Sequence, residues 1–346
     1  MKMAKQVRSH SRTFFAVLFA VLVLVTTLVS ANVVLGQDTT PPTITKSIPE
    51  LPDSPQYTSG ENTYVTSGTT LRVRVEGAES GVGSCSITVT DSSNSVVLQS
   101  NIELPPCSSG DNDFMLPNSL PDGAYTISAT ATDNAGNTLS ATGNDPMTVI
   151  LDNTGPSITV TSPVGIYILD QPNVVASYSC DDGAGSGVAS CVGDPSNGAI
   201  IDTSSAALGS HNFIVTATDN LGNSASETAV YSVQYSVSGV LPPLRQVSDP
   251  NDAKTYKLGR TLPIKFQLRD AEGAFIGTAK ATLALYDANI KNSGKSNGGT
   301  DVFRYDPVAQ QYIYNLSTKN LSQGIYKIVI TLEDGTEIST YFRLGK

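Results

Sequence analysis

Three stretches of the chain share one pattern of apolar and polar residues. Each has an apolar side chain at every second position and ends in an Asp that leads into a Gly-containing turn; the stretches are 123–133, 209–219 and 324–334. A period of two is that of a β-strand with one buried face. Asn and Gly tolerate the positive φ angles of tight turns. The pattern therefore predicts three hairpins, each with a second strand after its turn, such as 337–344.

The spacing of these hairpins predicts three domains of one kind. The pattern recurs after about 90 and then about 115 residues, which is the size of one β-sandwich. Prolines mark the start of each unit, at Pro41-Pro42, Pro156 and Pro242-Pro243. Proline suits links between domains because it cannot donate to a strand ladder. We expect an all-β fold, with a segment 1–36 followed by three tandem sandwich modules over 38–151, 152–239 and 240–346.

The first 36 residues indicate export. Four basic residues, Lys2, Lys5, Arg8 and Arg12, precede the unbroken apolar run 14–25, and Val29-Ser30-Ala31 offers small side chains for cleavage. A cleaved signal peptide is one interpretation. A retained N-terminal anchor is the other, because about 20 mostly apolar residues can span a bilayer. Either one predicts an extracellular or cell-surface protein that contacts the membrane only through an uncleaved segment 1–36.

The four cysteines fall in two pairs along the chain. Cys85 and Cys107 belong to the first expected module, and Cys180 and Cys191 to the second. Four cysteines allow three pairings, and in an oxidising compartment this spacing favours one local disulfide in each module. A zinc site is the rival interpretation, but it would have to bring both pairs together without a supporting His cluster.

Charge is distributed unevenly. Residues 37–239 hold 3 basic and 21 acidic residues, for a net charge of −18, whereas residues 240–346 hold 14 basic and 10 acidic residues, for +4. Acidic modules repel nucleic acid, which argues against a nucleic-acid partner. The basic third module could bind an anionic envelope polymer; the alternative is ordinary solvated surface charge.

Several motifs resemble those of exported repeat proteins. The starts Asp38-Thr-Thr-Pro-Pro and Asp152-Asn-Thr-Gly-Pro, with the turns of the form Ala-x-Asp-x-x-Gly-Asn, make modules one and two similar to bacterial and archaeal immunoglobulin-like repeats. Module two also resembles a hyalin-type repeat, in which the two cysteines pair. Module three resembles a C-terminal module named for its Pro-x-Lys-Phe motif, carried here by Pro263, Lys265 and Phe266. The resemblance implies immunoglobulin-like sandwiches, an envelope or extracellular location, and no known catalytic residues.

The residues that enzymes use do not form a familiar site. His211 is the only histidine after residue 36, and it occupies the position of Tyr125 and Tyr326 in the other modules. We expect its ring to cover the start of a strand, as a corner tyrosine does in immunoglobulin-like sandwiches. The chain has no Gly-x-Ser-x-Gly elbow, and Asp181-Asp182 is expected in an exposed turn of a Gly-rich loop. We therefore expect no enzymatic activity.

Calcium is the one cofactor that the pattern suggests. Calcium takes six to eight oxygen ligands. The acidic modules repeat oxygen-bearing residues at their starts and in their hairpin turns, at Asp38, Asp133, Asn137, Asp152, Asp219 and Asn223. The alternative is an Asx turn, in which Asp and Asn bond only their own backbone.

Two further features of module three carry expectations. Leu262, Ile264, Phe266 and Leu268 alternate onto one face, so Lys265 should point to the other face, where it is solvated or pairs with a carboxylate. Asn315 and Asn320 both begin glycosylation sequons, which predict a surface loop.

Two functions remain open from the sequence. One is a structural or adhesive surface protein that binds an extracellular protein or neighbouring copies of itself. The other is a carbohydrate- or polymer-binding accessory protein that uses the basic third module on envelope polysaccharide. Fold analogy does not choose between them.

Overall fold

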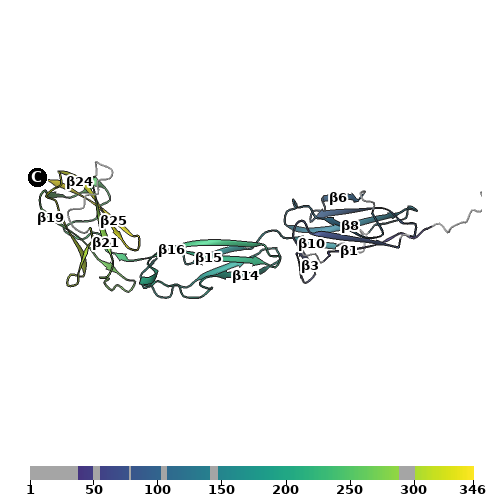
Figure 1. Ribbon diagram of the computed structural model, residues 1–346, viewed down its shortest axis with the longest axis horizontal. Coiled ribbons are helices and arrows are strands. Elements are labelled where there is room, and N and C mark those ends of the chain that lie inside the picture. Colours follow the sequence, from purple (N-terminus) through teal and green to yellow (C-terminus); the bar gives the residue numbers. More distant parts are fainter. Residues whose placement is uncertain (1–37, 50–54, 78, 103–106, 141–146, 288–300) are drawn as a thin grey trace, which may run out of the picture. The chain divides into compact units, whose positions relative to one another are not determined.

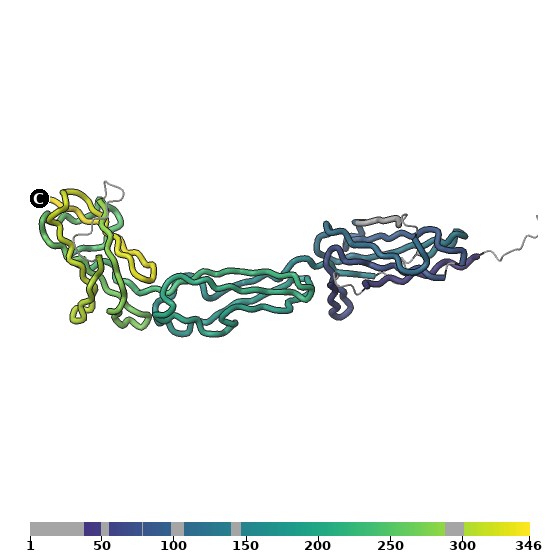
Figure 2. Tube along the Cα trace, in the orientation of Figure 1, coloured from purple at the N-terminus to yellow at the C-terminus, as the bar shows by residue number. Residues whose placement is uncertain are grey.

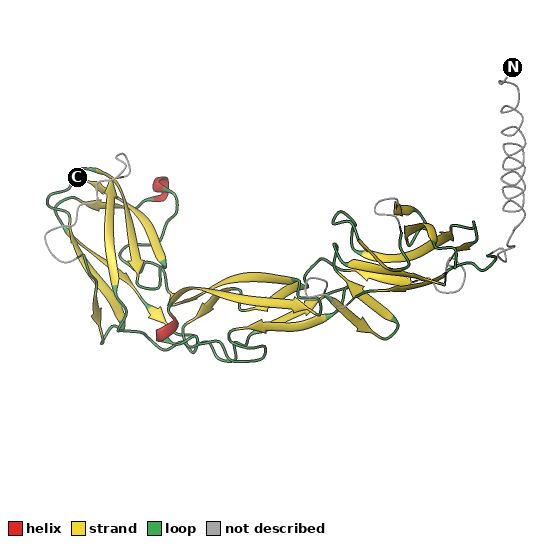
Figure 3. Cartoon of the chain, turned by 45° about the vertical axis from the view of Figure 1, so that its right-hand side comes forward, coloured by secondary structure: helices red, strands yellow, loops and turns green. Residues whose placement is uncertain are grey.

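The computed structural model describes residues 38–49, 55–77, 79–102, 107–140, 147–287 and 301–346, and these are almost entirely β-strand and turn (Figures 1 and 3). The predicted signal peptide or anchor, 1–36, lies outside the described residues. The chain divides into two compact units, Met1–Leu151 and Asp152–Lys346. The described part contains no helix that is long and apolar enough to cross a membrane.

The first unit is a sandwich of two sheets. Its smaller sheet has the order β1-β4-β7, with bounds Thr43–Ser47, Thr70–Glu76 and Gly110–Met115. Its larger sheet has the order β2 (Gln56–Ser59), β3 (Asn62–Val65), β10 (Met147–Leu151), β8 (Gly123–Asp133), β5 (Val82–Asp91) and β6 (Val96–Ile102). A short strand, β9 (Thr138–Ser140), also pairs with β8. Alternate residues of β4, β5 and β8 fill the core, including Val73, Ile87 and Ile127. The predicted period of two is therefore confirmed for β8.

The second unit begins with a smaller sandwich. β11 (Ser157–Ser162) pairs with β13 (Ser177–Asp181), and a four-stranded sheet has the order β12-β16-β15-β14, with bounds Gly165–Ile168, Ser224–Gln234, Gly209–Asp219 and Val188–Gly193. The predicted hairpin is β15 and β16, whose register runs from Gly209↔Val233 to Thr218↔Ser224. The core of this second module is small and centres on Tyr178 and Phe213, whose rings lie 5.8 Å apart.

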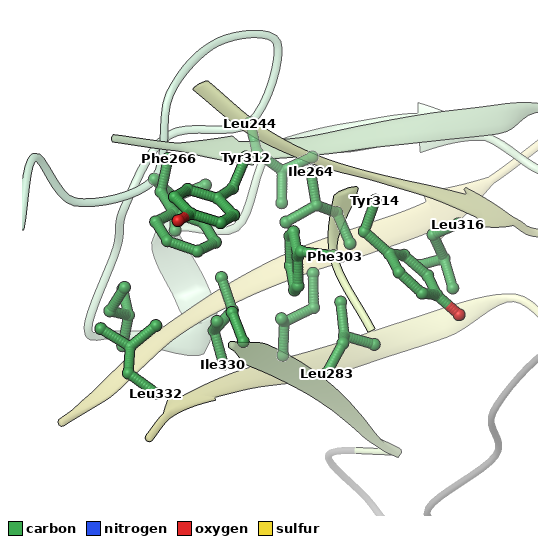
Figure 4. Packing of buried hydrophobic residues seen from close by; sticks show 14 of the residues in the cluster. Leu244, Ile264, Phe266, Leu283, Phe303, Tyr312, Tyr314, Leu316, Ile330 and Leu332 are labelled. Carbon is green, nitrogen blue, oxygen red and sulfur yellow. The ribbon is translucent and has the colours of Figure 1, made fainter. Parts of the chain in front are cut away.

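The third module has three sheets around the largest core. The sheets have the orders β17-β20, β18-β25-β24-β21 and β19-β23-β22. The first sheet contains β17 (Ser236–Val237) and β20 (Leu268–Arg269). The second contains β18 (Thr255–Lys257), β25 (Glu337–Gly345), β24 (Gly324–Leu332) and β21 (Ala281–Asp287). The third contains β19 (Thr261–Phe266), β23 (Gln311–Ser317) and β22 (Arg304–Asp306). Aromatic rings stack inside it, with Phe266 lying 4.9 Å from Tyr312 and 5.0 Å from Phe303 (Figure 4). We expected the third module from residue 240, and in the structure Ser236 already pairs with Arg269.

The second and third modules interlock at their junction. Leu169 follows β12 in the second module, yet its buried side chain belongs to the core of the third. Its carbonyl accepts a 2.9 Å hydrogen bond from the Ala271 N–H. Tyr235, between β16 and β17, is also buried; its N–H donates to Asp334 Oδ2 at 2.8 Å and its hydroxyl donates to Glu333 at 3.0 Å. The tube along the Cα trace shows the chain passing from one module directly into the other (Figure 2). A continuous core and paired polar groups therefore join these two modules.

Candidate cation site in the second module

The hairpin turn after β15 supplies the first acidic side chain of the site. Asp219 is 3% exposed, and its Oδ1 accepts backbone hydrogen bonds from Leu221 (2.9 Å) and Asn223 (2.8 Å). The Asn223 Nδ2 donates to Asp219 Oδ2 at 2.7 Å and to the Asp152 carbonyl at 3.0 Å. Because a carboxylate only accepts hydrogen bonds, Asn223 must turn its amide nitrogen to it. We expected Asn223 to offer an oxygen to a cation; its amide instead holds the turn against the start of the module.

The start of the module and a loop bring two more carboxylates to this turn. Asp152 is 2% exposed, and its Oδ2 accepts the Ser186 N–H at 2.7 Å. Asp182, after β13, is half-buried, and its Oδ2 accepts the Gly187 N–H at 2.7 Å. One carboxylate oxygen from each of Asp152, Asp182 and Asp219 lies within 4.8 Å of the other two. Three segments that are distant in sequence therefore meet at one acidic cluster.

Asp182 is the residue that sequence reasoning missed. We expected it in an exposed turn, but it lies half-buried against two other carboxylates. A Cβ atom at Gly185 would lie 2.5 Å from Asp182 Oδ2 and 2.9 Å from Asp152 Oδ2, so any larger residue there would displace these carboxylates. The Gly-rich run was visible in the sequence. The tight packing of this run against carboxylates was not visible there, because it depends on contacts between segments that are distant in sequence.

The electrostatics of the acidic cluster are unfavourable without a counter-charge. Burial raises the pKa of Asp182 above its usual range, and the negative charges of Asp152 and Asp219 raise it further. The ion pairs that the structure describes join Arg72 and Arg74 to acidic residues of the first unit, and none reaches this cluster. Buried carboxylates without a cation are costly, and backbone N–H groups offset only part of that cost.

The first module repeats the frame of this site. Asn137 Nδ2 donates to Asp133 Oδ2 and to the Asp38 carbonyl, both at 2.9 Å, and the Ser80 N–H donates to Asp38 Oδ2 at 3.0 Å. Asp133 is buried like Asp219. The linker Asp and the hairpin turn of each acidic module are therefore joined in one way, with the Asn as hydrogen-bond donor.

The first module nevertheless lacks the third carboxylate. Glu76 lies opposite Thr43 as Asp181 lies opposite Ser157, so it matches Asp181 rather than Asp182, and its carboxylate accepts a 2.6 Å hydrogen bond from Arg74 Nε. The Ser80 hydroxyl lowers the pKa of Asp38 through a hydrogen bond and also accepts the Ala135 N–H at 3.1 Å. Among the residues that the structure describes, the cluster of the second module is the only metal-compatible group of three or more His, Cys, Asp or Glu side chains.

The predicted corner rings occupy equivalent places in all three modules. The Tyr125 hydroxyl donates to the Pro121 carbonyl at 2.8 Å, and the Tyr326 hydroxyl donates to Ser322 at 3.0 Å, each four residues upstream. His211 Nε2 lies 2.7 Å from the Ala207 carbonyl, and its ring stacks on Tyr231 at 5.1 Å. The geometry is that of the tyrosine corner of immunoglobulin-like sandwiches, so His211 has a structural role.

Both local disulfides are present. Cys85 bonds Cys107 and Cys180 bonds Cys191, with Cα–Cα distances of 5.8 and 6.0 Å, and no cysteine is free. The rival zinc site is thereby excluded, because a disulfide sulfur is not the thiolate that zinc binds.

The motif of the third module lies at a sheet edge. Leu262, Ile264, Phe266 and Leu268 are buried as the alternation predicts, and Pro263 lies in the edge strand β19. Lys265, on the opposite face, is half-buried. For the sequons, Asn320 is exposed in the turn between β23 and β24. Asn315 is also exposed, but it lies in strand β23 opposite Pro263 rather than in a loop.

In the comparison with known protein families, a family model matches the first module. Residues 46–153 match the family model described as a bacterial Ig-like domain. The chain is built of immunoglobulin-like sandwiches. Solved structures that match the chain include a tetra-tandem repeat from the extending region of a large adhesion protein, at 16% identity over 88% of this chain and 74% of that one, with a TM-score of 0.26. The Escherichia coli adhesin FdeC matches at 12% identity over 89% of this chain and 98% of that one, with a TM-score of 0.27. Extracellular domains 3–5 of Drosophila OTK match at 13% identity over 87% of this chain and 100% of that one, with a TM-score of 0.29. No curated protein matches the chain.

Proposed function

We propose that this protein is a non-enzymatic structural or adhesive protein of the cell surface or extracellular space, in which tandem immunoglobulin-like modules act as spacers. The observation that carries the proposal is the interlocked junction of the second and third modules. Leu169 enters the core of the third module, and Tyr235 bonds Asp334 and Glu333. A spacer must resist bending at its joints, and a buried apolar contact with paired polar groups provides that resistance.

The covalent and local features support an exported protein. Each of the first two modules has a disulfide, which persists in oxidising compartments. The only histidine after residue 36 is used in a corner contact. The finer resemblances of the sequence, to a hyalin-type repeat and to the Pro-x-Lys-Phe module, belong to the same proposal. The stacking of Phe266 on Tyr312 gives that motif a role in the core.

Cell fractionation with external protease tests this proposal. In the native host, we expect the chain in the envelope fraction, cleaved by protease added to intact cells, while a cytoplasmic marker stays intact. The intact mass of the recovered chain then shows whether residues 1–36 are removed. A chain protected from protease until the cells are lysed would refute surface display, whereas a chain found free in the medium would favour a secreted role.

A polymer-binding role is the second candidate, and one surface favours it. The outward face of β24 and β25 places Lys327 opposite Tyr341, with its ammonium group 6.0 Å from the ring, and Arg343 follows on the same strand face. Cationic and aromatic side chains together suit an anionic polysaccharide. We expect the chain to be retained on such a polymer and released by salt. Lys327→Ala with Arg343→Ala should weaken retention more than Lys319→Ala, a charge change in a nearby exposed turn.

A further inference from the structure

The acidic cluster of the second module combines buried charge with an unused polar group. Asp152 and Asp219 are almost fully buried, and Asp182 is half-buried beside them. The Ser186 hydroxyl is also buried in a residue that is 5% exposed, and it has no hydrogen-bond partner in the structure. A buried hydroxyl without a partner is unusual in a folded protein and calls for a ligand or another explanation.

The residue that carries the unpartnered hydroxyl contacts the acidic cluster through its backbone. Ser186 donates its backbone N–H to Asp152 Oδ2 at 2.7 Å, and covalent geometry keeps a serine hydroxyl within about 4 Å of its own nitrogen. In the first module, the matching Ser80 turns its hydroxyl to the linker carboxylate of Asp38 and to the Ala135 N–H. In the second module, the matching N–H of Leu221 bonds Asp219 instead. The Ser186 oxygen is therefore left for another partner.

The size and chemistry of the cluster fit one hard divalent cation. Ligand oxygens at about 2.4 Å from a calcium ion lie at most about 4.8 Å apart, and the three carboxylate oxygens lie within 4.8 Å of one another. Every available donor in the cluster is an oxygen, and no His or Cys takes part. Oxygen donors with carboxylate charge favour calcium over zinc or copper.

We propose that Asp152, Asp182, Asp219 and the Ser186 hydroxyl form a calcium site at the start of the second module. The ion neutralises the buried carboxylates and ties three segments together: the residue that opens the module, the 182–187 loop and the β15–β16 turn. The first module has the same frame, but among the described residues no third carboxylate joins Asp38 and Asp133. Calcium thus holds one particular end of one module, independently of whether the protein is a spacer or a polymer binder.

Titration of the full chain with calcium tests the site. After removal of metal with a chelator, calorimetric titration with calcium chloride should give one high-affinity site per chain, and calcium should raise the melting temperature, since a ligand that binds only the folded state stabilises it. Hydrogen exchange should slow in the peptides that cover 182–187 and 219–223. The absence of both binding heat and protection would overturn the proposal. An equal response to magnesium chloride would overturn the assignment to calcium.

Asp182→Asn provides a variant with effects of opposite sign. Without calcium it should raise the melting temperature, because it removes one of three repelling charges. With calcium it should lose the increase seen in the wild type and bind at least tenfold more weakly. Glu76→Gln removes an exposed carboxylate at the end of β4 in the first module, and as the control it should leave calcium binding unchanged. If Asp182→Asn does not fold, Ser186→Ala carries the test, with weaker calcium binding expected. Wild-type calcium affinity in the variant that folds would refute the site.

Discussion

Replacing Leu169 by Ala tests the interlocked junction most directly. The residue belongs by sequence to the second module and by packing to the third, and it is 3% exposed. The substitution removes three carbon groups, at about 0.8 kcal/mol each for the loss of burial alone. A cavity adds to this cost, and buried Leu→Ala changes range from about 2 to 5 kcal/mol. We expect a loss of about 3 kcal/mol from the free energy of unfolding of the third module. At about 4–8 °C for each kcal/mol in a domain of about 100 residues, this lowers the melting temperature of that module by about 12–24 °C.

Hydrogen exchange with mass spectrometry is the assay, because it assigns destabilisation to particular strands. Leu169→Ala should accelerate exchange in the strands of the third module that line its core, β19, β23 and β24. The separate core around Phe213 should keep its protection. Ile166→Ala, in strand β12 just before Leu169 but 64% exposed, is the matched control and should change stability by less than about 0.5 kcal/mol.

The outcome that refutes this reasoning is specific. If Leu169→Ala and Ile166→Ala give the same melting temperature and the same exchange in the third module, Leu169 does not contribute to the core of that module. The junction would then rest on the hydrogen bonds of Tyr235 and of the Leu169 backbone, and the spacer proposal would lose its buried apolar contact.

Two further predictions concern the disulfides and the buried tyrosines. Replacing both Cys180 and Cys191, which are 11 residues apart, by Ala should cost about 3 kcal/mol of stability by the loop-entropy relation; an unchanged denaturant midpoint would contradict it. Burial raises the pKa of Tyr312 to about 12, above the value of about 10 in an unfolded chain. Its neutral form therefore contributes stability that is complete below pH 10 and is lost as pH rises toward 12. Tyr312→Phe should make the melting temperature fall less steeply over that interval, and an unchanged slope would show that this phenol does not titrate on unfolding.

The strands of this protein could be predicted from local sequence. Residues 123–133 and 209–219 alternate between apolar and polar side chains, and both are strands with the expected face buried. The turns at Asp133 and Asp219 also form as expected, since Asp, Asn and Gly determine a tight turn through contacts a few residues apart. Export and a compartment that permits disulfides predicted the pairing of Cys180 with Cys191, which are close in the chain.

The candidate site could be predicted only in part. Asp152 and Asp219 were expected at a cation site, but nothing in the sequence around Asp182 distinguishes it from an exposed loop residue. Asn223 was expected as a ligand because its side chain carries an oxygen. The structure uses its nitrogen, because the neighbouring carboxylate needs a donor.

The sequence by itself therefore determined the strands, the hairpin turns and the modular repeat, because a period of two and a turn motif act over a few residues. Only the tertiary structure decided that Asp182 meets Asp152 and Asp219, and that Leu169 belongs to the core of the third module. Both contacts join segments tens of residues apart. Which side chains meet across such distances depends on how the sheets pack and where the loops close, and no local pattern encodes that.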